Sequence, residues 1–94
     1  MITHVVMFKL KNPDETMEQT REVLAGMAGK IPQLREIEVG VDVLRSDRSY
    51  DLVLITKFDS LEDLKAYQVH PVHQDVIAYI NTVKEVSIAV DYAS

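Results

Sequence analysis

The chain has 94 residues, of which 27% are charged and 47% are hydrophobic, and its formal net charge at pH 7 is −5. This composition predicts one globular domain over residues 1–94. The chain has no cluster of basic residues, which argues against nucleic-acid binding, and no long apolar run, which argues against a membrane span. The absence of cysteine excludes disulfides and thiolate chemistry, and no signal peptide is visible, so we expect a cytoplasmic protein.

Residues 2–10 are apolar and β-branched, which predicts a first strand. Alternation turns one set of its residues to the same face: His4, Val6, Phe8 and Leu10. Asn12 and Pro13 then predict the start of a helix, and Gly29 and Pro32 bracket its expected end. The apolar face of that helix consists of residues at helical spacing: Met17, Leu24, Met27, Ala28 and Ile31.

A second strand is expected over residues 35–45, where Gly40 indicates a bulge or a close approach of another part of the chain. A polar turn over residues 45–49 separates it from a third strand over residues 50–58. One face of the third strand is expected to hold alternate residues: Tyr50, Leu52, Leu54, Thr56 and Phe58.

Ser60 with Asp63 predicts the N-cap of a short helix, whose inner face is expected to consist of Leu61, Leu64 and Tyr67. His70-Pro71 ends that helix and begins another. The second helix has an apolar stripe of four residues: His73, Val76, Ile77 and Ile80. Residues 84–92 alternate again and predict the last strand, with one apolar row: Val86, Ile88, Val90 and Tyr92.

The order β-α-β-β-α-(α)-β predicts a ferredoxin-like α+β protomer, with helices on one face of an antiparallel four-stranded sheet. The other face of the sheet would be apolar too. The residues expected there are Val5, Met7, Val53, Ile55 and the valines of the second strand. Since the helices cover only one face, we expect a homodimer in which two sheets stack face to face.

Three histidines are the best candidates for chemistry. In this fold the first and third strands are adjacent, so His4 is expected beneath the helices, near Tyr67 and His73. An imidazole and a phenol can exchange protons with a bound carbonyl compound, with His73 as base and Tyr67 as donor. The residues expected to line such a site are His4, Val6, Phe8, Leu24, Leu52, Leu54 and His70.

Two other interpretations stay open. The histidines can be packing residues of a structural dimer, with His70 as a cap between two helices. His70 and His73 can also form a metal pair completed by Asp75 or His4, although their spacing is not diagnostic and we rank this last. No phosphate-binding loop is present. We expect neither a cofactor nor a metal.

Over essentially all 94 residues the chain resembles the stress-responsive α/β-barrel domain (Dabb) family. The segments that carry this resemblance are His4-Val5-Val6-Met7-Phe8-Lys9-Leu10, Ile31-Pro32, Glu38-Val39-Gly40-Val41-Asp42, Tyr50-Asp51-Leu52, Phe58-Asp59-Ser60, Tyr67-Gln68-Val69-His70-Pro71-Val72-His73 and Val90-Asp91-Tyr92. The resemblance implies a ferredoxin-like protomer that dimerises through its sheets into an α/β barrel, and plant members are stress-associated proteins.

A plant polyketide cyclase of that family uses a general-base histidine, a tyrosine and a first-strand histidine, which match His73, Tyr67 and His4. This chain differs from the cyclase at four positions: it has Leu52 in place of a further histidine, and Thr20, Arg21 and Leu24 in place of aromatic residues. The resemblance implies a cofactor-free cyclase, isomerase or lyase that acts on a small apolar carbonyl compound. The alternative is a non-enzymatic, stress-associated structural dimer.

Overall fold

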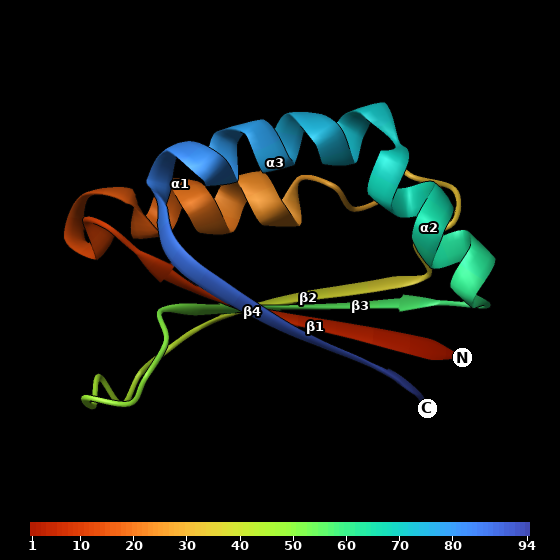
Figure 1. The fold of residues 1–94 in the computed structure, drawn as a ribbon. Coiled ribbons are helices and arrows are strands. Elements are labelled where there is room, and N and C mark those ends of the chain that lie inside the picture. The colour runs from red at the N-terminus through yellow and green to blue at the C-terminus, as the bar shows by residue number, and fades with distance from the viewer.

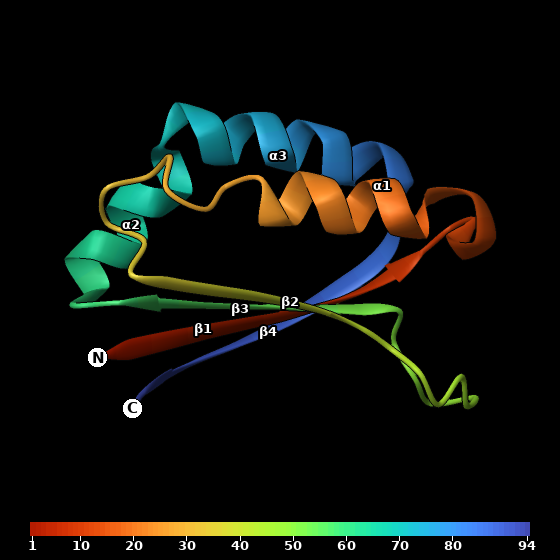
Figure 2. The same ribbon diagram turned by 180° about the vertical axis from the view of Figure 1, so that it is seen from behind.

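The computed structural model describes residues 1–94. Its elements are β1 (Ile2–Leu10), α1 (Pro13–Ala25), β2 (Glu36–Val41), β3 (Leu52–Phe58), α2 (Leu61–Val69), α3 (Pro71–Val83) and β4 (Lys84–Ala93). The strands form one antiparallel sheet of order β2-β3-β1-β4, and the helices cover one face of it (Figures 1 and 2). The predicted ferredoxin-like fold is confirmed. No helix has the length and apolar character that crossing a membrane requires.

The helices begin where local chemistry favours it. Pro13 opens α1 behind Asn12, and the Ser60 hydroxyl accepts the backbone N–H of Asp63 at 3.1 Å to cap α2. Between α2 and α3, His70 has an extended backbone and its Nδ1 accepts the N–H of Val72 at 3.1 Å. The cap role predicted for His70 is therefore confirmed.

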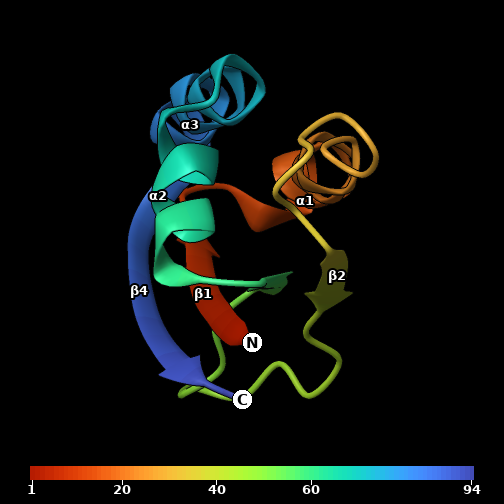
Figure 3. The same ribbon diagram turned by 90° about the vertical axis from the view of Figure 1, so that its right-hand side faces the viewer.

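The core lies between the helices and the sheet. Viewed along the strands, α1 lies on the β2 side and α2 on the side of β1 and β4 (Figure 3). The register places Val6 opposite Leu54 and Phe8 opposite Leu52, so the first and third strands are adjacent, as predicted. The buried apolar residues are Phe8, Leu10, Leu24, Met27, Ile31, Leu52, Leu54, Phe58, Leu64, Tyr67, Val76 and Ile80.

The first helix is shorter than its apolar pattern predicts. It ends at Ala25, after which the N–H of Met27 reaches back only three residues, to the carbonyl of Leu24 at 3.3 Å, in a tighter turn. Gly29 then takes a φ of 75°, in the left-handed region that favours glycine. Met27 and Ile31 are still buried, because the turns that follow the helix continue to pack on the core.

The second strand is also shorter than predicted, since β2 ends at Val41 and Val43 lies in the loop beyond it. Gly40 pairs with Val53 without a bulge. A Cβ at Gly40 would lie 3.0 Å from Val53 Cγ1, so the close approach is the correct interpretation. Because Gly40 takes the outward position, alternation turns Val39 toward the helices, and the prediction that the valines of this strand face outward is wrong.

Two further predictions need correction. Tyr50 precedes β3 and lies under the ammonium group of Lys9, 5.1 Å from Nζ, on the face away from the helices. The chain bends at Asp51, so the alternation of β3 does not extend back to Tyr50. Leu61 is 56% exposed and not on the inner face of α2, because this first residue of the helix lies beyond the core.

The sheet face opposite the helices, which we call the outer face, is uncovered in the single protomer and largely apolar, with charged residues toward its borders: Lys9, Glu36, Glu38 and Lys57. Register places on it Val5, Met7, Val53, Ile55, Val86, Ile88, Val90 and Tyr92. Met7 and the whole β4 row are exposed. A continuous apolar face of this kind is typical of an interaction surface.

Candidate functional site

Three side chains from three elements meet between the helices and the sheet. Tyr67 from α2 and His73 from α3 have ring centroids 4.4 Å apart, and the ring of His4 from β1 lies edge-on to Tyr67 at 6.5 Å. Phe58 packs against the tyrosine ring at 4.9 Å. The turn at His70-Pro71 brings His73 back toward Tyr67, so these three residues are neighbours in the fold, as the sequence predicts.

His73 is held as a neutral imidazole with one free nitrogen. Its Nδ1 lies 2.9 Å from the carbonyl oxygen of Gln68, and because a carbonyl only accepts, Nδ1 carries the proton. Burial lowers the pKa of His73 below its ordinary value; the Gln68 hydrogen bond works in the opposite direction, and nearby His4 adds to the lowering. At neutral pH the remaining nitrogen, Nε2, therefore has a lone pair and can act as a base.

Tyr67 is fully buried, and this burial raises the pKa of its phenol far above the ordinary range. The group therefore stays protonated at any physiological pH. Its hydroxyl donates to Met27 Sδ across 3.8 Å, and a thioether is a weak acceptor. The hydroxyl can consequently donate to a better acceptor, such as a carbonyl oxygen.

His4 has a partner that the sequence-based predictions omit from the site. The two residues face each other across β1 and β4, and His4 Nδ1 donates to a carboxylate oxygen of Asp91. This contact fixes the orientation of the imidazole and leaves its Nε2 free of the carboxylate. The alternation of the last strand could have identified Asp91. The apolar row of that strand faces away from the helices, so Asp91 faces toward them, on the same face of the sheet as His4.

The other predicted site residues divide into two groups. Phe8, Leu24, Leu52 and Leu54 are buried in the core and Val6 is partly buried against it. His70 instead uses its Nδ1 to cap α3. His, Asp and Glu side chains nowhere form a group of three or more that could hold a metal ion, so the arrangement that a metal pair at His70 and His73 requires is not formed.

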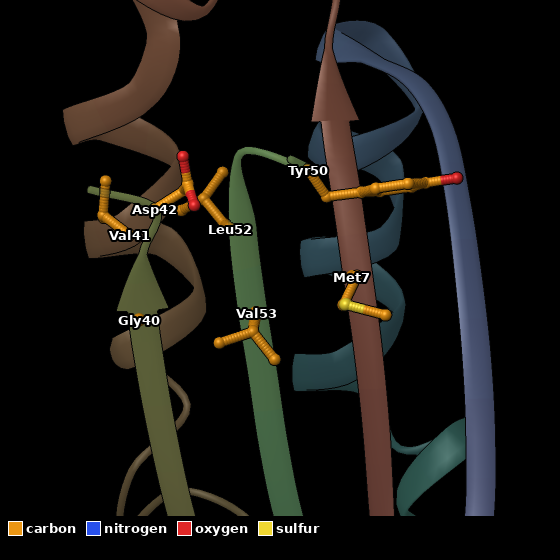
Figure 4. Close-up of a pocket in the computed structure, with 7 residues that line it drawn as sticks. All are labelled: Met7, Gly40, Val41, Asp42, Tyr50, Leu52 and Val53. Carbon is orange, nitrogen blue, oxygen red and sulfur yellow. The ribbon is translucent and has the colours of Figure 1, made fainter. Parts of the chain in front are cut away.

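Three hollows open on the surface, and none of them is lined by His4, Tyr67 or His73. One of about 370 Å³ lies between α1 and α3 and is lined partly by Met27, Gly26 and Val76. The sulfur of Met27 contacts the Tyr67 hydroxyl, so this side chain both lines the hollow and touches the phenol. The second hollow lies at the outer face and is shown in Figure 4. The third lies at the edge of the sheet formed by β2 and β3.

Comparison with known proteins gives a consistent result. Residues 2–94 match the model of the stress-responsive A/B barrel domain family. An uncharacterised protein of Streptomyces coelicolor is 33% identical over 84 residues, covering 83% of this chain and 84% of that protein. A stress-response A/B barrel domain-containing protein of Arabidopsis thaliana is 28% identical over 98% of this chain, which spans only 46% of that protein.

Solved structures share the fold. A dimeric protein of unknown function and ferredoxin-like fold from Bacteroides fragilis is 29% identical with a TM-score of 0.87, covering 99% of this chain and 95% of that one. A hydroxynitrile lyase from Passiflora edulis is 16% identical with a TM-score of 0.83, covering 97% of this chain and 90% of the lyase. At that identity the second likeness shows the fold alone.

Proposed function

Because the chain belongs to the stress-responsive A/B barrel domain family, we propose that it works as a homodimer that binds a small apolar carbonyl compound between its helices and its sheet. In this proposal His73 is the base, Tyr67 is the proton donor and His4, oriented by Asp91, positions the ligand. The reaction is a cofactor-free proton transfer of the cyclase, isomerase or lyase type.

One observation carries the proposal: a neutral imidazole and a protonated phenol lie 4.4 Å apart, centroid to centroid. Nε2 of His73 removes a proton from the carbon next to the carbonyl group and becomes an imidazolium. The Tyr67 hydroxyl donates to the carbonyl oxygen, on which the negative charge of the enolate develops. Return of the proton from His73 to the same or another atom of the ligand restores the starting state. A positioned acid or base of this kind contributes about 10²- to 10⁴-fold to the rate.

Access to this group is proposed to pass through the hollow between α1 and α3. Met27 lines that hollow and is in contact with the Tyr67 hydroxyl. Methionine is flexible and fills irregular gaps, so a rotation of its side chain would expose the phenol at low cost. Next to Met27 the lining includes the apolar residues Val23, Val72 and Val76, and it also includes the charged residues Glu22, Lys30 and Asp75. The apolar part suits the body of the ligand and the charged part its entry from water.

The dimer is supported by the uncovered apolar outer face and by the relative from Bacteroides fragilis, which is described as dimeric. A second function is favoured by a different observation. No hollow reaches Tyr67, and a site whose rings are packed together can serve stability alone. The second candidate is therefore a non-enzymatic structural dimer whose histidines are packing residues.

The experiment that separates the two candidates measures deuterium uptake at the methyl group of acetophenone, a small apolar ketone, in D₂O by NMR. The proposal predicts that the wild-type protein accelerates the exchange. His73→Gln should remove about 10²-fold or more of that acceleration, and Tyr67→Phe should also lower it, since each is a partner in the proton transfer.

Asn81→Ala is a matched control, because Asn81 is exposed on the same helix as His73 and has no part in the proposed site. Acceleration by wild type and Asn81→Ala, but not by His73→Gln, supports the enzyme. Equal exchange rates with the wild type, with His73→Gln and with no protein would contradict it and favour the structural dimer.

A further inference from the structure

Two aliphatic side chains in the loop between β2 and β3 are held out in solvent. Val43 is 93% exposed and Leu44 is 77% exposed. The loop, residues 42–51, leaves the end of the sheet and projects to the side away from the helices (Figures 1 and 2). We call it the β2–β3 arm. The arm therefore extends beyond the outer face, and Val43 and Leu44 are exposed on it.

The arm is a defined structure. Arg45 has a φ of 56°, in the left-handed region that is unfavourable for a residue with a side chain. Its backbone N–H donates to Asp42 Oδ2 at 2.7 Å, and its guanidinium Nη2 donates to Asp51 Oδ1 at 3.0 Å. Asp51 is itself buried, and its other oxygen accepts the N–H of Leu10 at 2.7 Å. The base of the arm is thus anchored to the end of β1, and this anchor keeps the strained turn in place.

The protomer alone does not offset the strain of this turn. Arg45 is held in an unfavourable backbone conformation, and the fold does not bury Val43 or Leu44 within the protomer in return. The exposed aliphatic pair lies next to a surface that also lacks a cover. Beside the base of the arm, the outer face has a hollow of about 220 Å³, whose lining includes Met7, Gly40 and Val53 (Figure 4).

We propose that the β2–β3 arm docks, through Val43 and Leu44, onto the outer face of a second copy of this chain. The inference rests on the proposed sheet-to-sheet homodimer and adds the contact that would clasp it. A two-fold interface is self-complementary, so each arm would reach the other protomer and both pairs of Val43 and Leu44 would be buried at once. A second copy suits the arm because it offers the same apolar face, and because the relative from Bacteroides fragilis is described as dimeric.

The chain has no cysteine, so single-cysteine variants report local access directly. Leu44→Cys is labelled with a maleimide at micromolar protein concentration, and again in the presence of a second substitution, Met7→Asp, which places a charge on the outer face to separate the copies. The proposal predicts at least tenfold slower labelling in the dimer than in the separated protomers. Val69→Cys is the matched control, because Val69 is 72% exposed at the end of α2, away from the outer face. Its labelling should be equally fast in both.

The second measurement is the dimer dissociation constant by sedimentation. Leu44→Asp should raise it at least tenfold and Val69→Asp should leave it unchanged. Equal labelling of Leu44→Cys in dimer and separated protomers, with dimers that Met7→Asp dissociates, would overturn the arm contact and leave the sheet dimer standing. A wild-type protein that is monomeric at these concentrations would overturn both. If Met7→Asp disturbs the far-ultraviolet circular dichroism, Ile88→Asp, on β4 of the same face, replaces it.

Discussion

The hydroxyl groups of two tyrosines should make very different contributions to stability, and the difference tests whether Tyr67 is built for the fold or for a ligand. The Tyr79 hydroxyl lies 3.1 Å from the hydroxyl of Thr20, which is fully buried. The Tyr67 hydroxyl has only the sulfur of Met27, at 3.8 Å. Replacing each tyrosine with phenylalanine removes the oxygen and keeps the ring packing.

The expected magnitudes follow from what each substitution leaves behind. Tyr79→Phe leaves the buried Thr20 hydroxyl without its partner, and an unpaired buried polar group costs about 1 to 3 kcal/mol. Tyr67→Phe leaves only a thioether, which needs no partner, and it removes a phenol hydroxyl that was buried against a weak acceptor. We therefore expect Tyr67→Phe to leave the free energy of unfolding unchanged or to raise it by up to about 1 kcal/mol.

Both variants are compared with the wild type by urea unfolding, followed by far-ultraviolet circular dichroism at one fixed protomer concentration, because the stability of a dimer depends on concentration. The midpoints are compared at an unchanged m-value. A loss of more than 1 kcal/mol in Tyr67→Phe, equal to that in Tyr79→Phe, would refute the reasoning. It would mean that the Tyr67 hydroxyl serves the fold.

Three further outcomes follow from the structure. Burial holds the pKa of folded His73 below its ordinary value of 6.5, so the unfolded chain binds more protons than the folded chain as the pH falls past that value. The contribution of His73 to the free energy of unfolding should be full above about pH 6.5 and decline on acidification. Urea unfolding at about pH 7.5 and about pH 5.5 should show a smaller decline for His73→Gln than for the wild type. Asp51→Ala leaves the N–H of Leu10 unpaired and should cost about 1 to 3 kcal/mol in urea unfolding, whereas Asp47→Ala, on the exposed part of the same arm, should stay within about 0.5 kcal/mol; equal effects would contradict the anchor. Met27→Ala should cost about 2 to 5 kcal/mol as a core truncation, yet raise the deuterium exchange rate at low acetophenone concentration; a rate that falls to the background would argue against entry past Met27.

Most of the fold could be predicted because it is encoded locally. The alternation of β1 and β3, the Ser60 cap and the His70-Pro71 break each depend on residues close together in the chain. The meeting of His4, Tyr67 and His73 followed from strand order and helix faces alone. The predicted ends of two elements were wrong. After Ala25 the buried apolar pattern continues through turns that are not helical, and after Val41 the apolar pattern of the strand continues into a loop in which Val43 is exposed.

The contacts that could not be predicted are those that depend on distant partners. Asp51 is polar and sits in a turn, and only the fold shows that it accepts the N–H of Leu10, 41 positions away. The pairing of Asp91 with His4 needs the register of β4 against β1. In the same way, the contact of Met27 with the Tyr67 hydroxyl arises from the path of the turns after α1, which no periodicity describes.

The central claim is that His73 presents a basic Nε2 which a small carbonyl compound can reach. It is tested most directly by long-range ¹H–¹⁵N correlation NMR of the histidine rings at pH 7, without and with acetophenone near its solubility limit. We expect a neutral His73 with its proton on Nδ1, and we expect the signals of both His73 and His4 to move as the ketone is added. A proton on Nε2 of His73, or rings of His73 and His4 whose signals do not respond to the ketone, would contradict it.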